Sequence, residues 1–180
     1  SDPAWRPDVA PRRMMHWAAH APLILASTDL IYRSAVLNHF ARVGRHLDQT
    51  ADRMPQGIQR IISWCGVIAM GILIAGNEPR RLFGESGLAK ALASGLTEDG
   101  GSICRSPDAQ CDLVDALVML RAVYALRKIA MPDAFEEALA RTASALAGLV
   151  LGDGALSSWQ GSVPTLRAGA LLEAAGASIR

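Results

Sequence analysis

The sequence predicts an all-α fold, and three observations carry that prediction. Alanine and leucine dominate the composition, and no segment shows the sustained two-residue alternation that is typical of a half-buried strand. Apolar residues recur instead at three- and four-residue steps in several segments. Capping signals mark helix starts, most clearly at Ser106-Pro107-Asp108, which combines an N-cap, a proline at the first helical position and an acidic first turn.

The first part of the chain is expected to form four helices. A helix over residues 11–26 begins near a proline, and a second helix over residues 30–51 is capped by Thr28 or Asp29. Its apolar face should contain Leu30, Leu37, Phe40, Ala41, Gly44 and Leu47. The third helix, residues 61–77, is nearly uncharged. Its length is only marginal for a membrane span, which needs ~20 residues. Burial among neighbouring helices is therefore the favoured interpretation. A fourth helix follows over residues 79–94.

The second part is expected to form two long helices, a short final helix and two glycine-rich loops. Asp99-Gly100-Gly101 lies in the least helical segment, residues 95–106, since glycines there favour a turn. Helices are expected from residue 107, over residues 133–151 and over residues 165–177, with a loop at 152–161. Helices joined alternately by tight and longer loops indicate αα-hairpins that stack, as in an α/α solenoid or a closed toroid. We expect one helical domain over residues 1–180.

Composition and motifs exclude several classes of function. Eighteen Lys and Arg against seventeen Asp and Glu give a net charge of +1, which supplies no field for holding nucleic acid. Three cysteines without a CxxC pair do not suggest structural zinc. His16 and His20 have a metal-compatible spacing, but packed or surface histidines are favoured because no third ligand stands nearby. We expect no metal and no cofactor.

One loop carries a resemblance to a known family. Asp99-Gly100-Gly101-Ser102-Ile103-Cys104-Arg105-Ser106-Pro107 resembles the D-G-G-H-x-x-R-S-P signature of the heparinase II/III family of polysaccharide lyases. Further segments resemble landmarks of bacterial heparinase II/III-like proteins in the same order: Trp5-Arg6-Pro7-Asp8, Arg12-Arg13, His20-Ala21-Pro22, Tyr32-Arg33, Arg45-His46-Leu47 and Gly152-Asp153-Gly154.

The resemblance implies the fold and activity of that family. The fold would be an incomplete (α/α) toroid, an internal fragment whose own chain continues into further toroid helices and a β-sandwich domain. The function would be binding of an acidic, uronate-containing polysaccharide for β-elimination, a carbon–oxygen lyase reaction. It implies a bacterial protein, in the periplasm or the cytoplasm. No membrane span is expected.

Candidate site residues follow from the loop and the resemblance. Arg105, Ser102 and Gln110 would donate to a sugar carboxylate or hydroxyl near a helix N-terminus, and Trp159 would stack on a sugar ring. His39 is the candidate catalytic acid or base. The sequence departs from the lytic pattern because Ala109 replaces the tyrosine that lytic members carry and Ser102 replaces the signature histidine.

Two hypotheses therefore stay open. The first is the helical domain of a lyase homologue that lacks the complete catalytic set. The alternative is a non-catalytic helical scaffold that binds a glycan, a peptide or a partner subunit.

Overall fold

The computed structural model describes residues 6, 9–74 and 76–177, and these residues are all-helical. The helices are α1 (Ala10–Ala19), α2 (Ala21–Ile24), α3 (Leu30–Thr50), α4 (Ile58–Leu73), α5 (Glu78–Gly95), α6 (Pro107–Leu126), α7 (Asp133–Ala147) and α8 (Arg167–Ala175), with a short 3₁₀ helix, η2 (Ala51–Arg53), after α3. No strand forms in this part of the chain, where only two isolated β-bridges occur. The predicted all-α class is confirmed.

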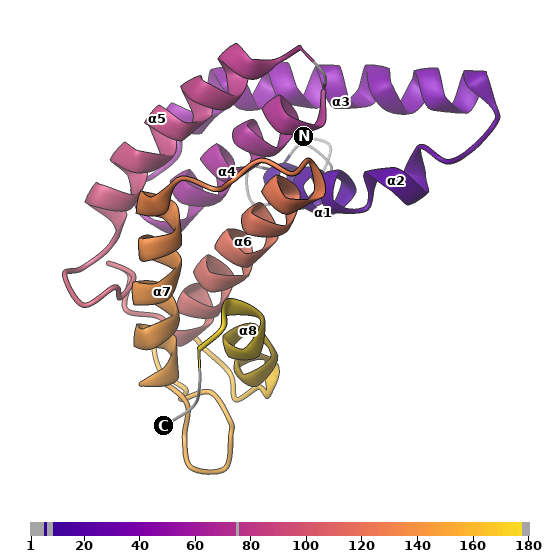
Figure 1. Cartoon of the computed structure of the whole chain (residues 1–180). Coiled ribbons are helices and arrows are strands. Elements are labelled where there is room, and N and C mark those ends of the chain that lie inside the picture. Colours follow the sequence, from indigo (N-terminus) through magenta and orange to yellow (C-terminus); the bar gives the residue numbers. More distant parts are fainter. Residues whose placement is uncertain (1–5, 7–8, 75, 178–180) are drawn as a thin grey trace.

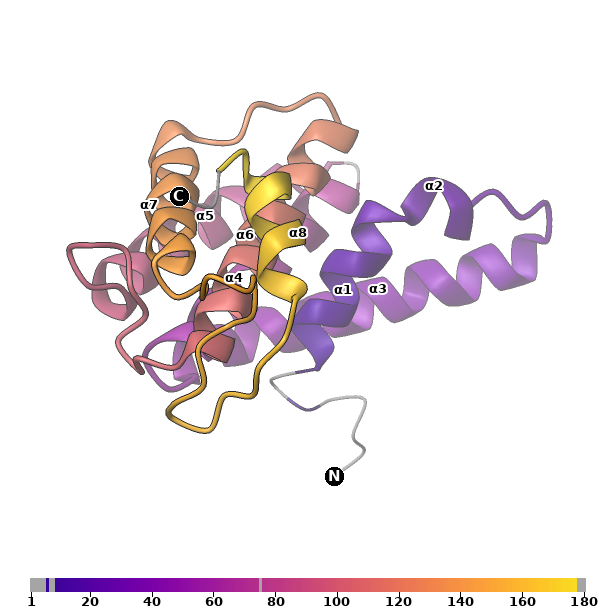
Figure 2. The same ribbon diagram turned by 90° about the horizontal axis from the view of Figure 1, so that it is seen from below.

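Helices α4 and α6 lie at the centre of the fold (Figure 1). Helix α4 packs against α1, α3, α5 and α6, while α6 also packs against α1, α7 and α8. The pairs α4–α5 and α6–α7 are therefore αα-hairpins that lie side by side, with α1 and α8 covering further faces (Figures 1 and 2). One core of buried apolar side chains runs through these helices. The arrangement does not establish a toroid.

The apolar stretch became the most buried helix, as its composition predicts. Every residue from Ile61 to Ile72 is buried in α4. Close packing of α4 against α5 depends on glycines in α5, since a Cβ built on Gly87 would lie 2.4 Å from the ring of Trp64. Within the described ranges, no helix combines the length and the hydropathy that crossing a membrane requires.

Two sequence expectations for the N-terminal helices are wrong. The helix expected over residues 11–26 is interrupted at His20 and continues as the short α2. Pro22 explains the interruption, because proline has no N–H to continue the helical hydrogen bonds and its ring clashes with the carbonyl group four residues earlier. In α3, capped by Asp29 as expected, Phe40, Gly44 and Leu47 are buried, but Leu30 and Leu37 are exposed.

The two glycine-rich loops contain the same turn, 54 positions apart in the sequence. Asp99 and Asp153 each accept a hydrogen bond from the backbone N–H two residues later, at 3.1 and 2.9 Å. Gly100 and Gly154 follow with φ of 86° and 81°, a left-handed conformation that glycine tolerates. The backbone bonds around the two turns also correspond. A repeated turn after α5 and after α7 supports the view that consecutive αα-hairpins are the structural unit.

The cap of α6 comes from a distant residue. Ser106 occupies the N-cap position, as the sequence predicts, but its side chain makes no capping hydrogen bond. The hydroxyl of Ser162 accepts a hydrogen bond from the N–H of Asp108 at 2.9 Å and lies 3.0 Å from the hydroxyl of Ser106. Ser162 therefore fastens the loop before α8 to the start of α6.

Candidate functional site

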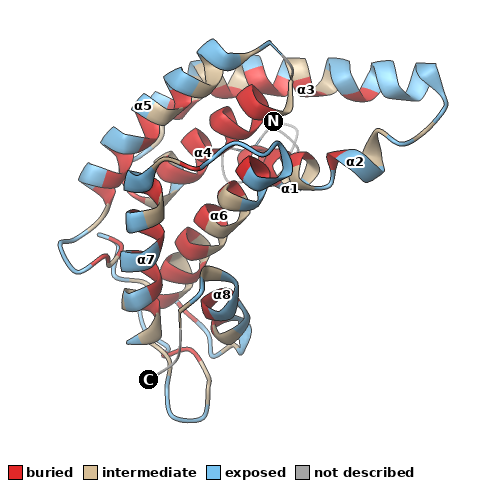
Figure 3. Ribbon diagram, viewed as in Figure 1, coloured by how far each residue is buried: buried red, intermediate tan, exposed pale blue. Residues whose placement is uncertain are grey.

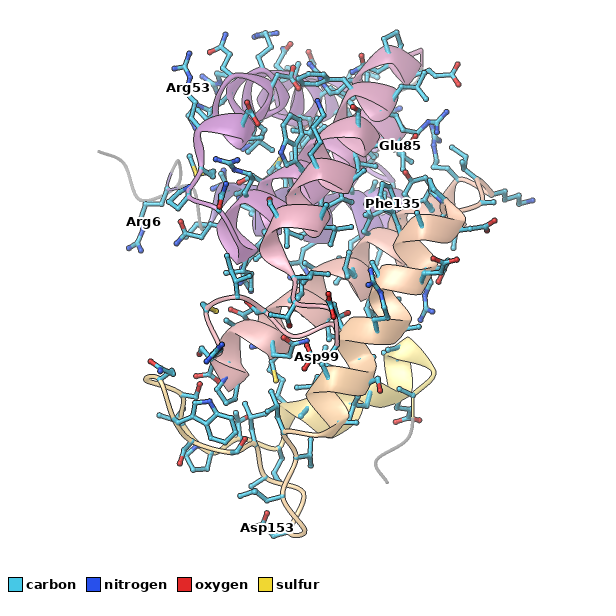
Figure 4. The ribbon with its side chains drawn as sticks, turned by 90° about the vertical axis from the view of Figure 1, so that its left-hand side faces the viewer. Arg6, Arg53, Glu85, Asp99, Phe135 and Asp153 are labelled. Atoms are coloured by element: carbon cyan, nitrogen blue, oxygen red, sulfur yellow. The ribbon has the colours of Figure 1, made fainter. Side chains whose placement is uncertain are left out.

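A pocket with a volume of about 710 Å³ lies between the 97–106 loop, the end of α7 and the loop before α8. Four of the five predicted site residues line it: Ser102, Arg105, Gln110 and Trp159. The remaining wall includes Thr97, Asp99, Gly101, Ser106, Ser144, Ala145, Gly148 and Leu149. Figure 4 shows Asp99 beside α7, whereas Asp153 of the second loop lies at the far tip of the molecule. The structure thus brings together residues that are separated by 57 positions in the sequence.

Arg105 and Trp159 are joined through the backbone. The indole N–H of Trp159 donates a hydrogen bond to the carbonyl oxygen of Arg105 at 2.8 Å. Arg105 and Gln160, the residue after the tryptophan, both have positive φ, 53° and 49°. A non-glycine residue in this conformation costs about 1–3 kcal/mol, and such strain clusters at functional sites. Arg105 is exposed, and its guanidinium forms no hydrogen bond or ion pair with any described residue.

Gln110 and Ser102 are tied into the protein and form the floor of the pocket. Gln110 is only 2% exposed, and its side-chain oxygen accepts a hydrogen bond from the N–H of Ser102 at 2.8 Å. Its side-chain nitrogen donates to the carbonyl oxygens of Gly100 and Thr142, at 3.1 and 2.9 Å. Both amide hydrogens are therefore used inside the protein, so Gln110 holds the loop against α7 and has no donor left for a ligand. The hydroxyl of Ser102 contacts the sulfur of Cys104 at 3.1 Å.

Asp99 brings a negative charge to the same pocket. Hydrogen bonds from the hydroxyl of Thr97 and from the N–H of Gly101 hold the pKa of Asp99 below its ordinary value. Both bonds end on one carboxylate oxygen, Oδ1. The pocket therefore combines one guanidinium, one ionised carboxylate, several hydroxyls and an apolar surface from Ala145, Leu149 and Trp159. The sequence predicts Asp99 only as part of the turn, so its place in the pocket wall is a finding of the structure.

His39 lies elsewhere. It projects from α3 against Trp17 of α1, with 5.5 Å between the ring centroids. Burial and the positive charges of Arg13 and Arg42 lower the pKa of His39, which favours the neutral imidazole. His39 is not among the residues that line the pocket, so the structure does not join it to the other candidates. Nor do the described residues include any cluster of three or more His, Cys, Asp or Glu side chains that could hold a metal ion.

A second exposed feature was missed at the sequence level. We define the α2–α3 arm as residues 21–38, that is α2, the connection after it and the first part of α3. Figures 1 and 2 show the arm extending beyond the other helices, at the opposite end of the molecule from the 97–106 loop. Figure 3 shows its surface as mostly exposed. Exposed large apolar side chains on the arm are Leu23 (79%), Leu30 (74%), Ile31 (84%), Tyr32 (44%) and Leu37 (45%).

Comparison with known proteins gives one informative relative. The chain is 28% identical over 160 residues to FtsZ-localized protein C of Caulobacter vibrioides (strain NA1000 / CB15N). The match covers 88% of this chain and 27% of that protein, so the chain spans about a quarter of the length of its relative. No protein-family profile and no solved structure matches the chain.

This relative corrects the predicted function. The loop resemblance implied a polysaccharide lyase homologue that binds acidic polysaccharide, whereas the relative is named for its localisation with FtsZ and not as a polysaccharide lyase. The lyase prediction is therefore wrong. The predicted polysaccharide and β-sandwich partners have no support either. Part of the resemblance, Trp5, Pro7 and Asp8, lies outside the described residues.

Proposed function

We propose that this chain is a helical docking module that binds FtsZ through the α2–α3 arm. The observation that carries the proposal is the similarity to FtsZ-localized protein C over 88% of the chain. Because that share is large, the match includes most of the structure described above. The arm supplies the physical means of association.

The arm has the composition of an interface. Its sequence, Ala21 to Asn38, contains only two charged residues, Asp29 and Arg33. Asp29 is occupied as the cap of α3, because its carboxylate accepts the N–H groups of Ile31 and Tyr32 at 2.8 and 3.2 Å. Interface cores are depleted of charge, and apolar patches on soluble proteins mark interaction sites. The arm therefore offers an apolar surface, and the start of α3 within it is already ordered by its cap.

Energetics favour burial of this surface by a partner. Full burial of a leucine or isoleucine side chain stabilises by about 1.5–3 kcal/mol relative to leaving it exposed. Leu23, Leu30 and Ile31 are each about three-quarters exposed or more, so nearly all of that stabilisation is unused in this structure. For the same reason, polar substitutions at these positions should barely change folding stability, within about 0.5 kcal/mol.

The test measures binding of the chain to its cognate purified FtsZ. The double variant Leu23→Ser, Ile31→Ser should bind more weakly by at least about tenfold, since each lost apolar contact costs about 1.5 kcal/mol or more. Leu166→Ser is the matched control, because Leu166 is 73% exposed but lies at the start of α8. Its affinity should equal that of the wild type.

Two results would count against the proposal. If the wild-type chain shows no binding to FtsZ, the docking function is wrong. If the arm variant and the control bind equally well, the arm is not the docking surface. The melting temperatures of both variants show whether a loss of binding reflects a loss of the fold.

We also infer that the stacked hairpins form part of a larger (α/α) arrangement of the toroid type. The repeated turns at Asp99 and Asp153 support this inference, because each follows a hairpin in the same way. A structure of a longer form of the protein would test it by showing whether further hairpins continue the stack around a common axis.

A further inference from the structure

We propose that the pocket between the 97–106 loop and α7 binds a peptide segment through a carboxylate, which pairs with the guanidinium of Arg105. This goes beyond the proposed docking to FtsZ. The 97–106 loop, which lines the pocket, and the α2–α3 arm lie at opposite ends of the molecule (Figures 1 and 2), so a substitution in one leaves the other intact.

The guanidinium of Arg105 is the group in the pocket that would bind a carboxylate. Arginine presents a planar set of donors that matches the two oxygens of a carboxylate, and such charge-assisted bonds are stronger than neutral ones. Several arginines elsewhere in the structure have carboxylate partners, including Arg12 with Asp112 and Arg80 with Asp48. Arg105 has no such partner among the described residues although it lines a pocket.

The backbone that carries Arg105 is preorganised. The backbone of Arg105 is held in its left-handed conformation by the indole of Trp159 and by the bond from its own N–H to the carbonyl oxygen of Ser102, at 2.9 Å. Gln110 fixes Ser102 in turn through a buried hydrogen bond. The base of the arginine side chain is therefore fixed before any ligand arrives, which lowers the entropic cost of binding.

The carboxylate of Asp99 decides the class of ligand. Asp99 lies in the same pocket and stays ionised, so the two charges of the pocket cancel. A polyanion, such as a nucleotide triphosphate or a sulfated glycan, would be repelled by Asp99. A peptide carries both complementary groups: a carboxylate for Arg105 and an amide N–H that can donate to Asp99. Its apolar side chain can contact Ala145, Leu149 and the half-exposed ring of Trp159.

Two sources of the carboxylate are compatible with this chemistry, a peptide C-terminus and an acidic side chain. The experiment therefore uses three short probes: N-acetyl-Gly-Leu with a free C-terminus, N-acetyl-Glu-Leu-amide and the uncharged N-acetyl-Gln-Leu-amide. Each probe is titrated into ¹⁵N-labelled protein, and the indole N–H signal of Trp159 is followed by NMR. The signal is assigned by its loss in Trp159→Phe. It reports on the pocket directly because that N–H bonds to the backbone of Arg105.

At least one carboxylate probe should shift the Trp159 signal in a saturable way, and the uncharged probe should not. Which of the two charged probes binds more tightly identifies the source of the carboxylate. Arg105→Asn should raise the dissociation constant by about tenfold or more, because asparagine keeps the left-handed backbone but removes the charge. Arg45→Ala, which removes an exposed arginine from α3, should leave the titration unchanged.

Three results would overturn the proposal. They are the absence of a shift with either charged probe up to its solubility limit, equal shifts with charged and uncharged probes, and unchanged binding in Arg105→Asn. The Leu23→Ser, Ile31→Ser variant should bind the probes normally. The experiment can therefore show that the peptide site is wrong without bearing on FtsZ docking, and the reverse.

Discussion

Replacing Gln110 with methionine should destabilise the protein strongly, although the change keeps the size of the side chain. Gln110 is buried and makes three hydrogen bonds, to the N–H of Ser102 and to the carbonyl oxygens of Gly100 and Thr142. Each such bond contributes about 1 kcal/mol net, and a buried group left without its partner costs about 1–3 kcal/mol. We therefore expect a loss of about 3 kcal/mol in the free energy of unfolding.

Denaturation by urea, followed by circular dichroism, measures this loss directly. For a chain of this size about 3 kcal/mol corresponds to a fall in melting temperature of roughly 6–12 °C. Gln49→Met is the matched control, because Gln49 is exposed on α3 and should change stability by less than about 0.5 kcal/mol. A loss below about 1 kcal/mol in Gln110→Met would refute the assignment of Gln110 as the residue that holds the loop against α7.

Three further predictions concern packing, capping and pH. Gly87→Ala should destabilise by about 1–3 kcal/mol because its Cβ would meet the ring of Trp64, although alanine usually favours a helix; equal or higher stability in urea would contradict the close approach. Ser162→Ala should cost about 1 kcal/mol and more than Ser106→Ala, because Ser162 supplies the capping oxygen; the reverse order of unfolding free energies would show that the sequence-local cap dominates. Burial raises the pKa of Cys65 from 9.0 to about 12, so the folded state holds this proton more tightly than the unfolded state and stability should fall as the pH rises above about 9. Cys65→Ala should weaken this pH dependence, and identical pH profiles of the two proteins would rule out the contribution.

Local signals predicted most of the helices. The cap at Asp29, the proline and acidic residue after Ser106, and the uncharged stretch that became α4 each placed a helix close to its observed position. Such signals act within a few residues, so they can be read from the sequence alone. They also predicted the turn at Asp99, whose hydrogen bonds are all local.

Features that depend on distant parts of the chain could not be read in the same way. Leu30 and Leu37 follow the helical period, but the period does not say whether another element covers them, and here none of the described elements does. Gln110 stood in a plausible place for a ligand donor. Its actual partners include Thr142, 32 positions away, which is a contact that no local pattern reveals. The capping of α6 by Ser162 likewise depends on a residue that is distant in the sequence.

The predicted pocket residues came together for a related reason. Ser102, Arg105 and Gln110 are close in the sequence around the start of α6, so their proximity in space was expected. Trp159 joins them because the second glycine-rich loop follows the neighbouring hairpin and is fastened to α6 by Ser162. The lyase function that this loop suggested is contradicted by the similarity to FtsZ-localized protein C. The loop alone could not decide the function, because a turn of this kind also serves a purely structural purpose.

Hydrogen–deuterium exchange of the chain with and without FtsZ tests the central claim most directly. The account predicts slower exchange on addition of FtsZ in the amides of residues 21–38, and unchanged exchange in the 97–106 loop. Unchanged exchange along the arm at FtsZ concentrations that saturate binding, or protection confined to another surface, would contradict it.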